Sequence, residues 1–93
     1  MKYPIHINAD VSSQILSASA EFDAVKDSLG VEFEEEVERV LNRVSDFPQL
    51  YPVDHGDVRR IALRRFNYVI FYAVRFGKIV VIEVRDARRA PPQ

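Results

Sequence analysis

The sequence predicts an α+β fold, in which an N-terminal helical hairpin packs on a small antiparallel sheet. Apolar residues recur at alternating steps of four and three through residues 11–46, which is the period of an α-helix. Through residues 58–85 they alternate with a period of two, which is typical of β-strands. A chain of 93 residues, 47% of them hydrophobic, is sized for one packed domain. We therefore expect a single domain, with the hairpin at about 11–46, a strand meander at about 58–85 and a tail at 86–93.

The N-terminal part is predicted to hold a short strand and the first helix. Residues 3–8 alternate weakly, and Pro4 favours an edge position because proline donates no ladder hydrogen bond. A helix at about 11–29 should follow, with Asp10 as its N-cap and Gly30 as its stop. Its apolar stripe consists of Val11, Ile15, Ala18, Phe22, Val25 and Leu29.

A second helix is expected at about 32–46, antiparallel to the first. Glutamates crowd its first turns, at the end where the helix dipole favours negative charge, and Pro48 ends it. Its apolar stripe consists of Phe33, Val37, Val40, Leu41, Val44 and Phe47.

Three strands are predicted after a loop at residues 50–57, which is rich in proline, glycine and aspartate. They lie at 58–66, 68–76 and 79–85, with a bend at Asn67 and a two-residue turn at Gly77-Lys78. The period of two sorts their side chains into two faces. The face predicted to receive the helices carries Ile61, Leu63, Tyr68, Ile70, Tyr72, Val74, Phe76, Val80, Ile82 and Val84. The opposite face is expected to be basic, with Arg60, Arg64, Arg75 and Arg85.

Charge divides the chain into an acidic and a basic part. Residues 1–57 hold 4 Lys/Arg and 12 Asp/Glu, whereas residues 58–93 hold 9 Lys/Arg and 2 Asp/Glu. This asymmetry predicts an anionic partner at one face. The overall net charge of −1 disfavours non-specific nucleic-acid binding by bulk charge.

Composition excludes several classes of protein. The chain has no cysteine, so disulfides, thiol catalysis and cysteine-based zinc sites are excluded. We expect a soluble cytoplasmic protein without membrane partners, because no apolar stretch approaches 18 residues and no signal-like segment begins the chain. His55 beside Asp54 and Asp57 lacks the spacing of a metal site, and we expect no metal or other cofactor.

The order of motifs resembles the RelE/ParE superfamily of bacterial toxins from type II toxin–antitoxin systems, and it is closer to the ParE branch. The segments that carry the resemblance are FPQLYP, VRRIALRRFNYVIFYAV and KIVVIEVRDARRAP. The chain departs from the family pattern at Asn67, where proline is frequent, and at Asp86, where histidine is frequent. The resemblance covers residues 3–91 and implies the fold predicted above.

The resemblance implies a toxin that arrests growth and is neutralised by a cognate antitoxin, in a toxin–antitoxin hetero-oligomer or with the toxin as a homodimer. ParE-type members inhibit DNA gyrase and are not nucleases. RelE-type members cleave mRNA on the ribosome without a metal. A third alternative is a non-toxic relic that only binds its antitoxin.

The chemistry of the residues favours a toxin that binds a protein target over an enzyme. RNA cleavage without a metal needs a general base, a general acid and cations near the phosphate. Both histidines, His6 and His55, lie outside the basic run, so no clear acid–base pair emerges. If the chain is a nuclease, its catalytic candidates are Tyr72, Asp86, Arg60 and Arg85.

Arginines are the predicted binding residues, although such a series also fits a solvated strand face. An acidic antitoxin segment would contact Arg59, Arg60, Arg64 and Arg65 through charge-assisted hydrogen bonds. The full set expected to bind target or antitoxin is Arg59, Arg60, Arg64, Arg65, Arg75, Arg85, Arg88 and Arg89.

Overall fold

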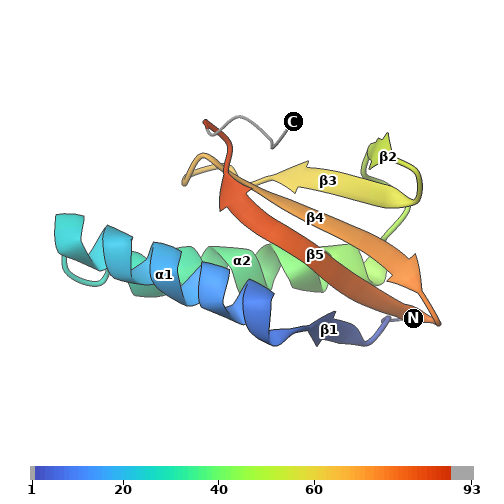
Figure 1. Ribbon diagram of the computed structural model, residues 1–93, viewed down its shortest axis with the longest axis horizontal. Coiled ribbons are helices and arrows are strands. Elements are labelled where there is room, and N and C mark those ends of the chain that lie inside the picture. The colour runs from blue at the N-terminus through green and yellow to red at the C-terminus, as the bar shows by residue number, and fades with distance from the viewer. Residues whose placement is uncertain (1, 89–93) are drawn as a thin grey trace.

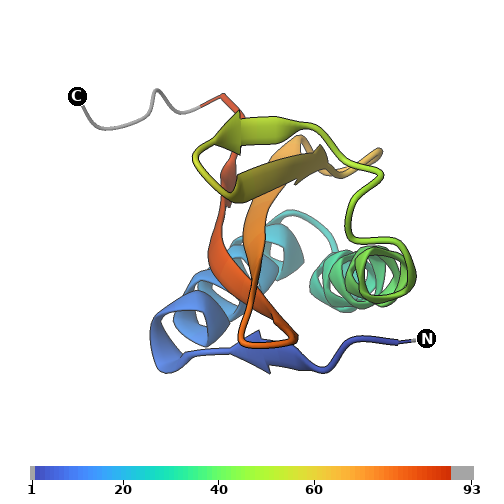
Figure 2. The ribbon, with the colours of Figure 1, turned by 90° about the vertical axis from the view of Figure 1, so that its right-hand side faces the viewer.

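A computed structural model describes residues 2–88, in which two helices cover one face of a five-stranded sheet (Figure 1). The elements are β1 (Ile5–Ile7), α1 (Ala9–Val25), α2 (Leu29–Asp46), β2 (Val53–His55), β3 (Val58–Ala62), β4 (Tyr68–Arg75) and β5 (Lys78–Asp86). The strand order is β1-β5-β4-β3-β2, so that β1 and the β2–β3 hairpin lie at opposite ends of the sheet (Figure 2). β1 runs parallel to β5 and the other neighbours are antiparallel. The predicted α+β fold is confirmed, and so is the edge position of the first strand.

The first helix begins earlier and ends earlier than predicted. Asn8, not Asp10, is the N-cap, because its side-chain oxygen accepts a hydrogen bond of 2.9 Å from the N–H of Val11. α1 ends at Val25, whose side chain is 78% exposed and does not belong to the core stripe as predicted. The reversal uses Ser28, which has a left-handed backbone with φ of 73°.

Gly30 is therefore not the stop of the first helix but a buried residue in the first turn of α2. Its N–H donates to the Asp23 carboxylate at 2.8 Å, which ties the two helices together. A Cβ at Gly30 would lie 2.4 Å from the carbonyl oxygen of Ser19. This glycine permits the close approach of the helices and does not end one of them.

The helices and the sheet enclose the main core. Most of the predicted stripe of α2 is buried, but Phe47 follows the end of the helix and is 56% exposed. Four rings, Phe22, Phe33, Phe66 and Tyr68, pack with centroid separations of 5.0 to 5.8 Å. The buried members of this core are Val11, Ala18, Phe33, Val37, Val40, Leu41, Val44, Leu63, Phe66, Tyr68, Ile70, Tyr72, Ile79, Val81 and Val84.

Two turns differ from the sequence prediction. The loop predicted at 50–57 contains β2, which pairs with β3 through Val53↔Arg59 and His55↔Val58. The second hairpin turn is formed by Phe76-Gly77, since Arg75 pairs with Lys78. Phe76 (φ 54°) and Gly77 (φ 74°) both have the positive φ that a type I′ turn requires, and Phe76 is consequently exposed.

A β-bulge in β5 changes which side chains face the helices. The register shifts between Phe71 and Tyr72, where Phe71 pairs with Glu83 and Tyr72 pairs with Val81, so Ile82 is the extra residue. Residues Ile79, Val81 and Val84 therefore lie in the core. The prediction that Val80 and Ile82 share the core face with Val84 was wrong, because a strict period of two does not cross a bulge.

The first strand of the meander is shorter than predicted. β3 ends at Ala62, and residues 63–67 form a connection that is closed by the hydrogen bond from Leu63 N to Tyr68 O. Asn67 has φ of 55°, which confirms the predicted bend. Leu63 and Phe66 insert into the core from this connection. Arg64 and Arg65 belong to the same connection and are therefore not on a strand.

Candidate functional site

The sheet has an outer face, defined here as the side of β3, β4 and β5 that is turned away from the helices. Its small apolar centre is a second buried cluster of Val58, Val69 and Phe71. The register places Arg60 and Glu83 on either side of Phe71. The residues of the outer face are Val58, Arg60, Ala62, Val69, Phe71, Ala73, Arg75, Lys78, Val80, Glu83 and Arg85.

The arginines of this face are paired with carboxylates. Arg75 donates two hydrogen bonds to Asp57, at 3.0 and 2.9 Å, and this pairing lowers the pKa of Asp57 and raises that of Arg75. Arg85 lies 3.2 Å from Glu83. Its guanidinium also stacks over the ring of Phe71, 4.7 Å from the ring centroid.

Acidic residues from the β2–β3 hairpin also reach this face. Asp54 lies 4.0 Å from Arg60, and Asp57 is the partner of Arg75. Four cations (Arg60, Arg75, Lys78 and Arg85) thus stand against three carboxylates (Asp54, Asp57 and Glu83), a balance of +1. The predicted basic face is therefore nearly neutral, since folding brings part of the acidic half onto it.

A hollow of about 230 Å³ opens where the hairpin overhangs the outer face. Nδ1 of His55 donates a hydrogen bond of 2.7 Å to the Asp54 carboxylate. The hollow is lined by Asp54, His55, Val58, Phe71, Ile82, Glu83 and Arg85. The prediction that His55 lies outside the basic run holds in sequence but not in space, because β2 folds back on β3. The Gly56-Asp57 pair between Val53–His55 and Val58 was the available hairpin signal.

The catalytic candidates do not converge on one site. The structure places Arg60 and Arg85 on the outer face, but Tyr72 is fully buried on the other side of β4. The Tyr72 hydroxyl donates to the carbonyl of Pro48 at 2.6 Å, and burial raises its pKa to about 12. Asp86 lies at the end of β5, where it accepts hydrogen bonds from the Arg88 side chain at 3.0 and 2.7 Å. Tyr72 is thus held in the core and does not contact the outer face.

The four arginines predicted for antitoxin binding also separate. Arg59 donates to the carbonyl of Tyr51 at 2.6 Å, and Arg65 pairs with Glu32 at 2.9 Å. Arg60 lies on the outer face, and Arg64 lies beside α2. Arg88 is exposed near the end of β5, and Arg89 lies outside the described residues.

Arg64 contributes to a groove of about 510 Å³ between α2 and β3, which we call the α2–β3 groove. Its basic members are Arg39, Arg43 and Arg64, and its lining residues are Glu36, Arg39, Val40, Arg43, Leu50, Tyr51, Ile61, Ala62 and Arg64. Arg39 pairs with the buried Glu36, whereas Arg43 and Arg64 have no ion-pair partner among residues 2–88. Sequence reasoning missed this groove because Arg39 and Arg43 belong to a helix and Arg64 to a distant segment.

The part of the chain that the structure describes has no group of three or more histidine, aspartate or glutamate side chains placed to hold a metal ion. Neither of the helices within residues 2–88 is long and apolar enough to cross a membrane.

Comparison with known proteins gives one family and several related folds. Residues 16–91 match the family model described as ParE toxin of type II toxin–antitoxin system, parDE. No curated protein matches the chain. The isolated Escherichia coli RelE toxin has 22% sequence identity and a TM-score of 0.70, over 95% of this chain and 87% of that chain.

Two further solved structures have the same fold. The chromosomal ParDE system of Pseudomonas aeruginosa includes a chain with 11% identity and a TM-score of 0.69, over 94% of this chain and 98% of that chain. A mutant E. coli RelE toxin in complex with a RelBc antitoxin peptide gives 21% identity and a TM-score of 0.64, over 90% of this chain and 82% of that chain. At these identities the structural matches establish the fold, and the family rests on the sequence model.

Proposed function

Because the chain belongs to the ParE toxin family of type II toxin–antitoxin systems, we propose that it arrests growth by binding a protein target through the outer face of its sheet. DNA gyrase is the target that the resemblance to ParE-type toxins implies. The toxin meets this target in the cytoplasm and carries no metal or cofactor.

The observation that carries the proposal is the pairing of the outer-face cations. A surface that binds RNA gains most of its affinity from unpaired Lys and Arg side chains that neutralise phosphates. Here Arg75 and Arg85 are already paired with carboxylates, around the apolar cluster of Val58, Val69 and Phe71. The cluster itself is buried, so the paired arginines around it would make the contacts, and arginine is enriched in protein–protein interfaces.

Supercoiling by purified gyrase is the decisive assay. The wild-type toxin should inhibit supercoiling, and Arg60→Glu should remove the inhibition because it adds a second negative charge beside Asp54. Arg43→Glu is the matched control, since it makes the same charge change on the other side of the molecule, in α2. Uninhibited supercoiling at micromolar wild-type toxin, or equal loss in both variants, would contradict the proposal.

The antitoxin is proposed to cover the α2–β3 groove with an acidic segment. Arg43 and Arg64 offer guanidinium groups that have no ion-pair partner among residues 2–88, and Leu50, which is 68% exposed, and Ile61 offer apolar area. Antitoxin segments that fold on binding gain affinity from such combined surfaces. This position replaces the predicted set of Arg59, Arg60, Arg64 and Arg65, of which Arg64 alone lines the groove.

Co-expression with the small gene next to that of the toxin tests this part of the proposal. The two products should purify as a stable complex, and Arg43→Glu should weaken it while Arg60→Glu does not. Separate elution of the two wild-type proteins at low salt would show that this neighbour is not a cognate antitoxin. Equal affinity of Arg43→Glu would show that the antitoxin binds elsewhere.

A ribosome-dependent endoribonuclease is the second candidate, and the position of His55 favours it. With Nδ1 held by Asp54, Nε2 of His55 is the ring atom that can exchange a proton with a substrate bound over Phe71. Of the predicted catalytic cations, Arg85 lines the same hollow as His55, and Arg60 lies on the same face opposite Phe71. Primer extension on ribosome-bound mRNA decides between the two targets. Codon-specific cuts that disappear in His55→Ala, with supercoiling unaffected, would reverse the ranking.

If growth, supercoiling and mRNA are all unaffected by a toxin that still binds its antitoxin, the chain is a non-toxic relic.

A further inference from the structure

β1 covers only one end of its neighbour β5. It pairs with Ile79, Val80 and Val81, whereas β5 continues to Asp86. At Asn8 the chain leaves the sheet and enters α1. The second half of β5 therefore has β4 on one side and no strand on the other, among the described residues.

The backbone of this half presents hydrogen-bonding groups to the open side. The N–H of Ala87 donates to the carbonyl of Asn67, which faces β4. Since N–H and C=O groups alternate in direction along an antiparallel ladder, those of Val84 point the opposite way, toward the open edge. The structure confirms this direction, because the Val84 N–H donates to the side-chain oxygen of Gln14 at 2.9 Å.

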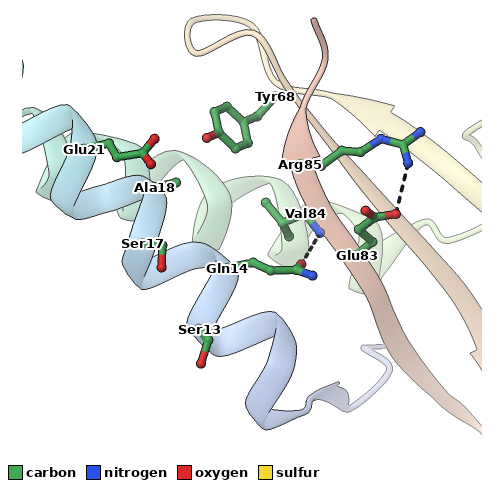
Figure 3. Close-up of a pocket in the computed structure, with 9 residues that line it drawn as sticks. All are labelled: Ser13, Gln14, Ser17, Ala18, Glu21, Tyr68, Glu83, Val84 and Arg85. Atoms are coloured by element: carbon green, nitrogen blue, oxygen red, sulfur yellow. Dashed lines mark hydrogen bonds and ion pairs between the residues drawn. The ribbon is translucent and has the colours of Figure 1, made fainter. Parts of the chain in front are cut away.

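Gln14 thus occupies the place where a neighbouring strand would put a carbonyl oxygen. Figure 3 shows its carboxamide reaching from α1 to the backbone of β5. Gln14 accepts one hydrogen bond at this position, whereas a strand would both accept from the N–H of Val84 and donate to its carbonyl. The contact covers the edge only in part and can be exchanged for a better one.

The space beside the edge is a groove of about 360 Å³, which we call the β5-edge groove. Its α1 side consists mostly of small side chains, so that an extended backbone can approach (Figure 3). Its lining residues are Ser13, Gln14, Ser17, Ala18, Glu21, Tyr68, Glu83, Val84 and Arg85. The β5 residues from Ile82 to Arg85 border the open side, and this stretch is long enough to pair with a short strand.

Charge indicates what kind of segment fits. α1 carries three acidic residues, Asp10, Glu21 and Asp23, and no basic residue. Glu21 lines the groove, while Glu83 and Arg85 compensate each other. The groove is therefore net negative, and it favours a segment that places a lysine or arginine opposite Glu21.

We propose that the β5-edge groove receives an extended segment of the antitoxin, which displaces Gln14 from Val84 and adds a strand in line with β1. This inference rests on the proposed function, in that it requires an antitoxin. It gives the antitoxin a second contact, in addition to the α2–β3 groove and on the opposite side of the molecule.

Affinity measurements on two matched variants test the proposal. Ser17→Lys places bulk and positive charge in the groove, whereas Ala20→Lys makes the same change at an exposed position of α1 that does not line it. Ser17→Lys should raise the Kd for the antitoxin roughly tenfold, because a strand hydrogen bond and a charge contact are lost together. Ala20→Lys should bind like the wild type, and both variants should keep the wild-type melting temperature.

Hydrogen exchange of the Val84 amide gives an independent readout that does not depend on affinity. In the free toxin, Gln14→Ala should speed exchange at Val84, since its acceptor is removed. In the complex, exchange at Val84 should be slow in the wild type and in Gln14→Ala alike, because the antitoxin strand supplies the acceptor.

The outcomes separate this inference from the proposed function. If the wild-type toxin binds no antitoxin at all, the proposed function fails. If a tight complex forms but Ser17→Lys binds normally and Val84 in Gln14→Ala exchanges as fast as in the free variant, the inference is wrong. If Val84 becomes protected merely on raising the concentration of toxin alone, the edge pairs with a second copy of the chain and the inference is overturned.

Discussion

Removal of the Tyr72 hydroxyl separates a structural tyrosine from a catalytic one. The side chain is fully buried, and its hydroxyl donates to the buried carbonyl of Pro48 at 2.6 Å, which joins β4 to the segment that follows α2. Tyr72→Phe deletes this hydrogen bond and leaves the rest of the ring in place. We expect a less stable toxin with unchanged potency per folded molecule.

The magnitude follows from the geometry. The lost hydrogen bond contributes about 1 kcal/mol, and the Pro48 carbonyl, left without a partner in the core, costs about 1 kcal/mol more. The free energy of unfolding should therefore fall by about 2 kcal/mol. For a domain of this size the melting temperature should drop by roughly 8–16 °C.

The pH dependence provides a second signature. Burial raises the pKa of Tyr72 to about 12 from an ordinary value of 10.0. Because the pKa is higher in the folded state, the contribution of neutral Tyr72 to stability is fully present below pH 10 and is lost as the pH rises toward 12. The stability gap between the wild type and Tyr72→Phe should therefore narrow over this range.

Urea unfolding at several pH values, combined with the growth-arrest assay, measures both effects. A change in stability below about 0.5 kcal/mol, or a gap that stays constant to pH 12, would refute the structural reasoning. Lost growth arrest in a variant that remains folded at the growth temperature would show that Tyr72 acts on a substrate.

Three further substitutions test other parts of the structure. Gly30→Ala should lower the free energy of unfolding by roughly 1–3 kcal/mol in urea unfolding, because the new Cβ would stand 2.4 Å from the Ser19 carbonyl oxygen. This loss is expected although alanine is the better helix former. Equal or higher stability would contradict it. Hydrogen bonds from Arg75 lower the pKa of Asp57 in the folded state below its ordinary value of 3.8. The pair therefore stabilises the fold above pH 3.8, and this contribution is lost as the pH falls through the lower pKa of the folded state. Acid titrations of Asp57→Asn and wild type should accordingly converge at low pH, and parallel curves would argue against the pair. Arg88 is one of the arginines predicted to bind the target, so Arg88→Glu should abolish growth arrest. The melting temperature should not change, since the Arg88 side chain is 73% exposed. Undiminished growth arrest would remove the C-terminal end of β5 from the target-binding surface.

The sequence was sufficient for the elements whose burial is regular. Except at their ends, where Val25, Phe47 and Phe76 are exposed, the stripes of the two helices and the core face of β4 follow a constant period, so position predicts which side chains are inside. The helix junction was not predictable in this way. Ser28 adopts the left-handed conformation that is expected of glycine, and Gly30 is selected by the distance to a neighbouring helix, which is a tertiary property.

The candidate site was less predictable because it depends on departures from regularity. One extra residue, Ile82, exchanges the two faces of β5, and no composition signal marks it. The two-residue turn after His55 converts a loop into a strand and brings that histidine over the outer face. The predicted basic face lost its charge for a similar reason, since Asp54 and Asp57 reach it from the acidic half of the sequence.

The parallel pairing of β1 with β5 has a consequence for how the toxin becomes active during synthesis. Ile5 pairs with Ile79, so the first strand acquires its partner only after synthesis has reached β5. Such a distant pairing closes a long loop and forms late in folding. The helices can form early, but the sheet that carries the outer face is completed only with its last strand. A chain truncated before β5 therefore has neither a complete sheet nor the edge proposed to bind the antitoxin.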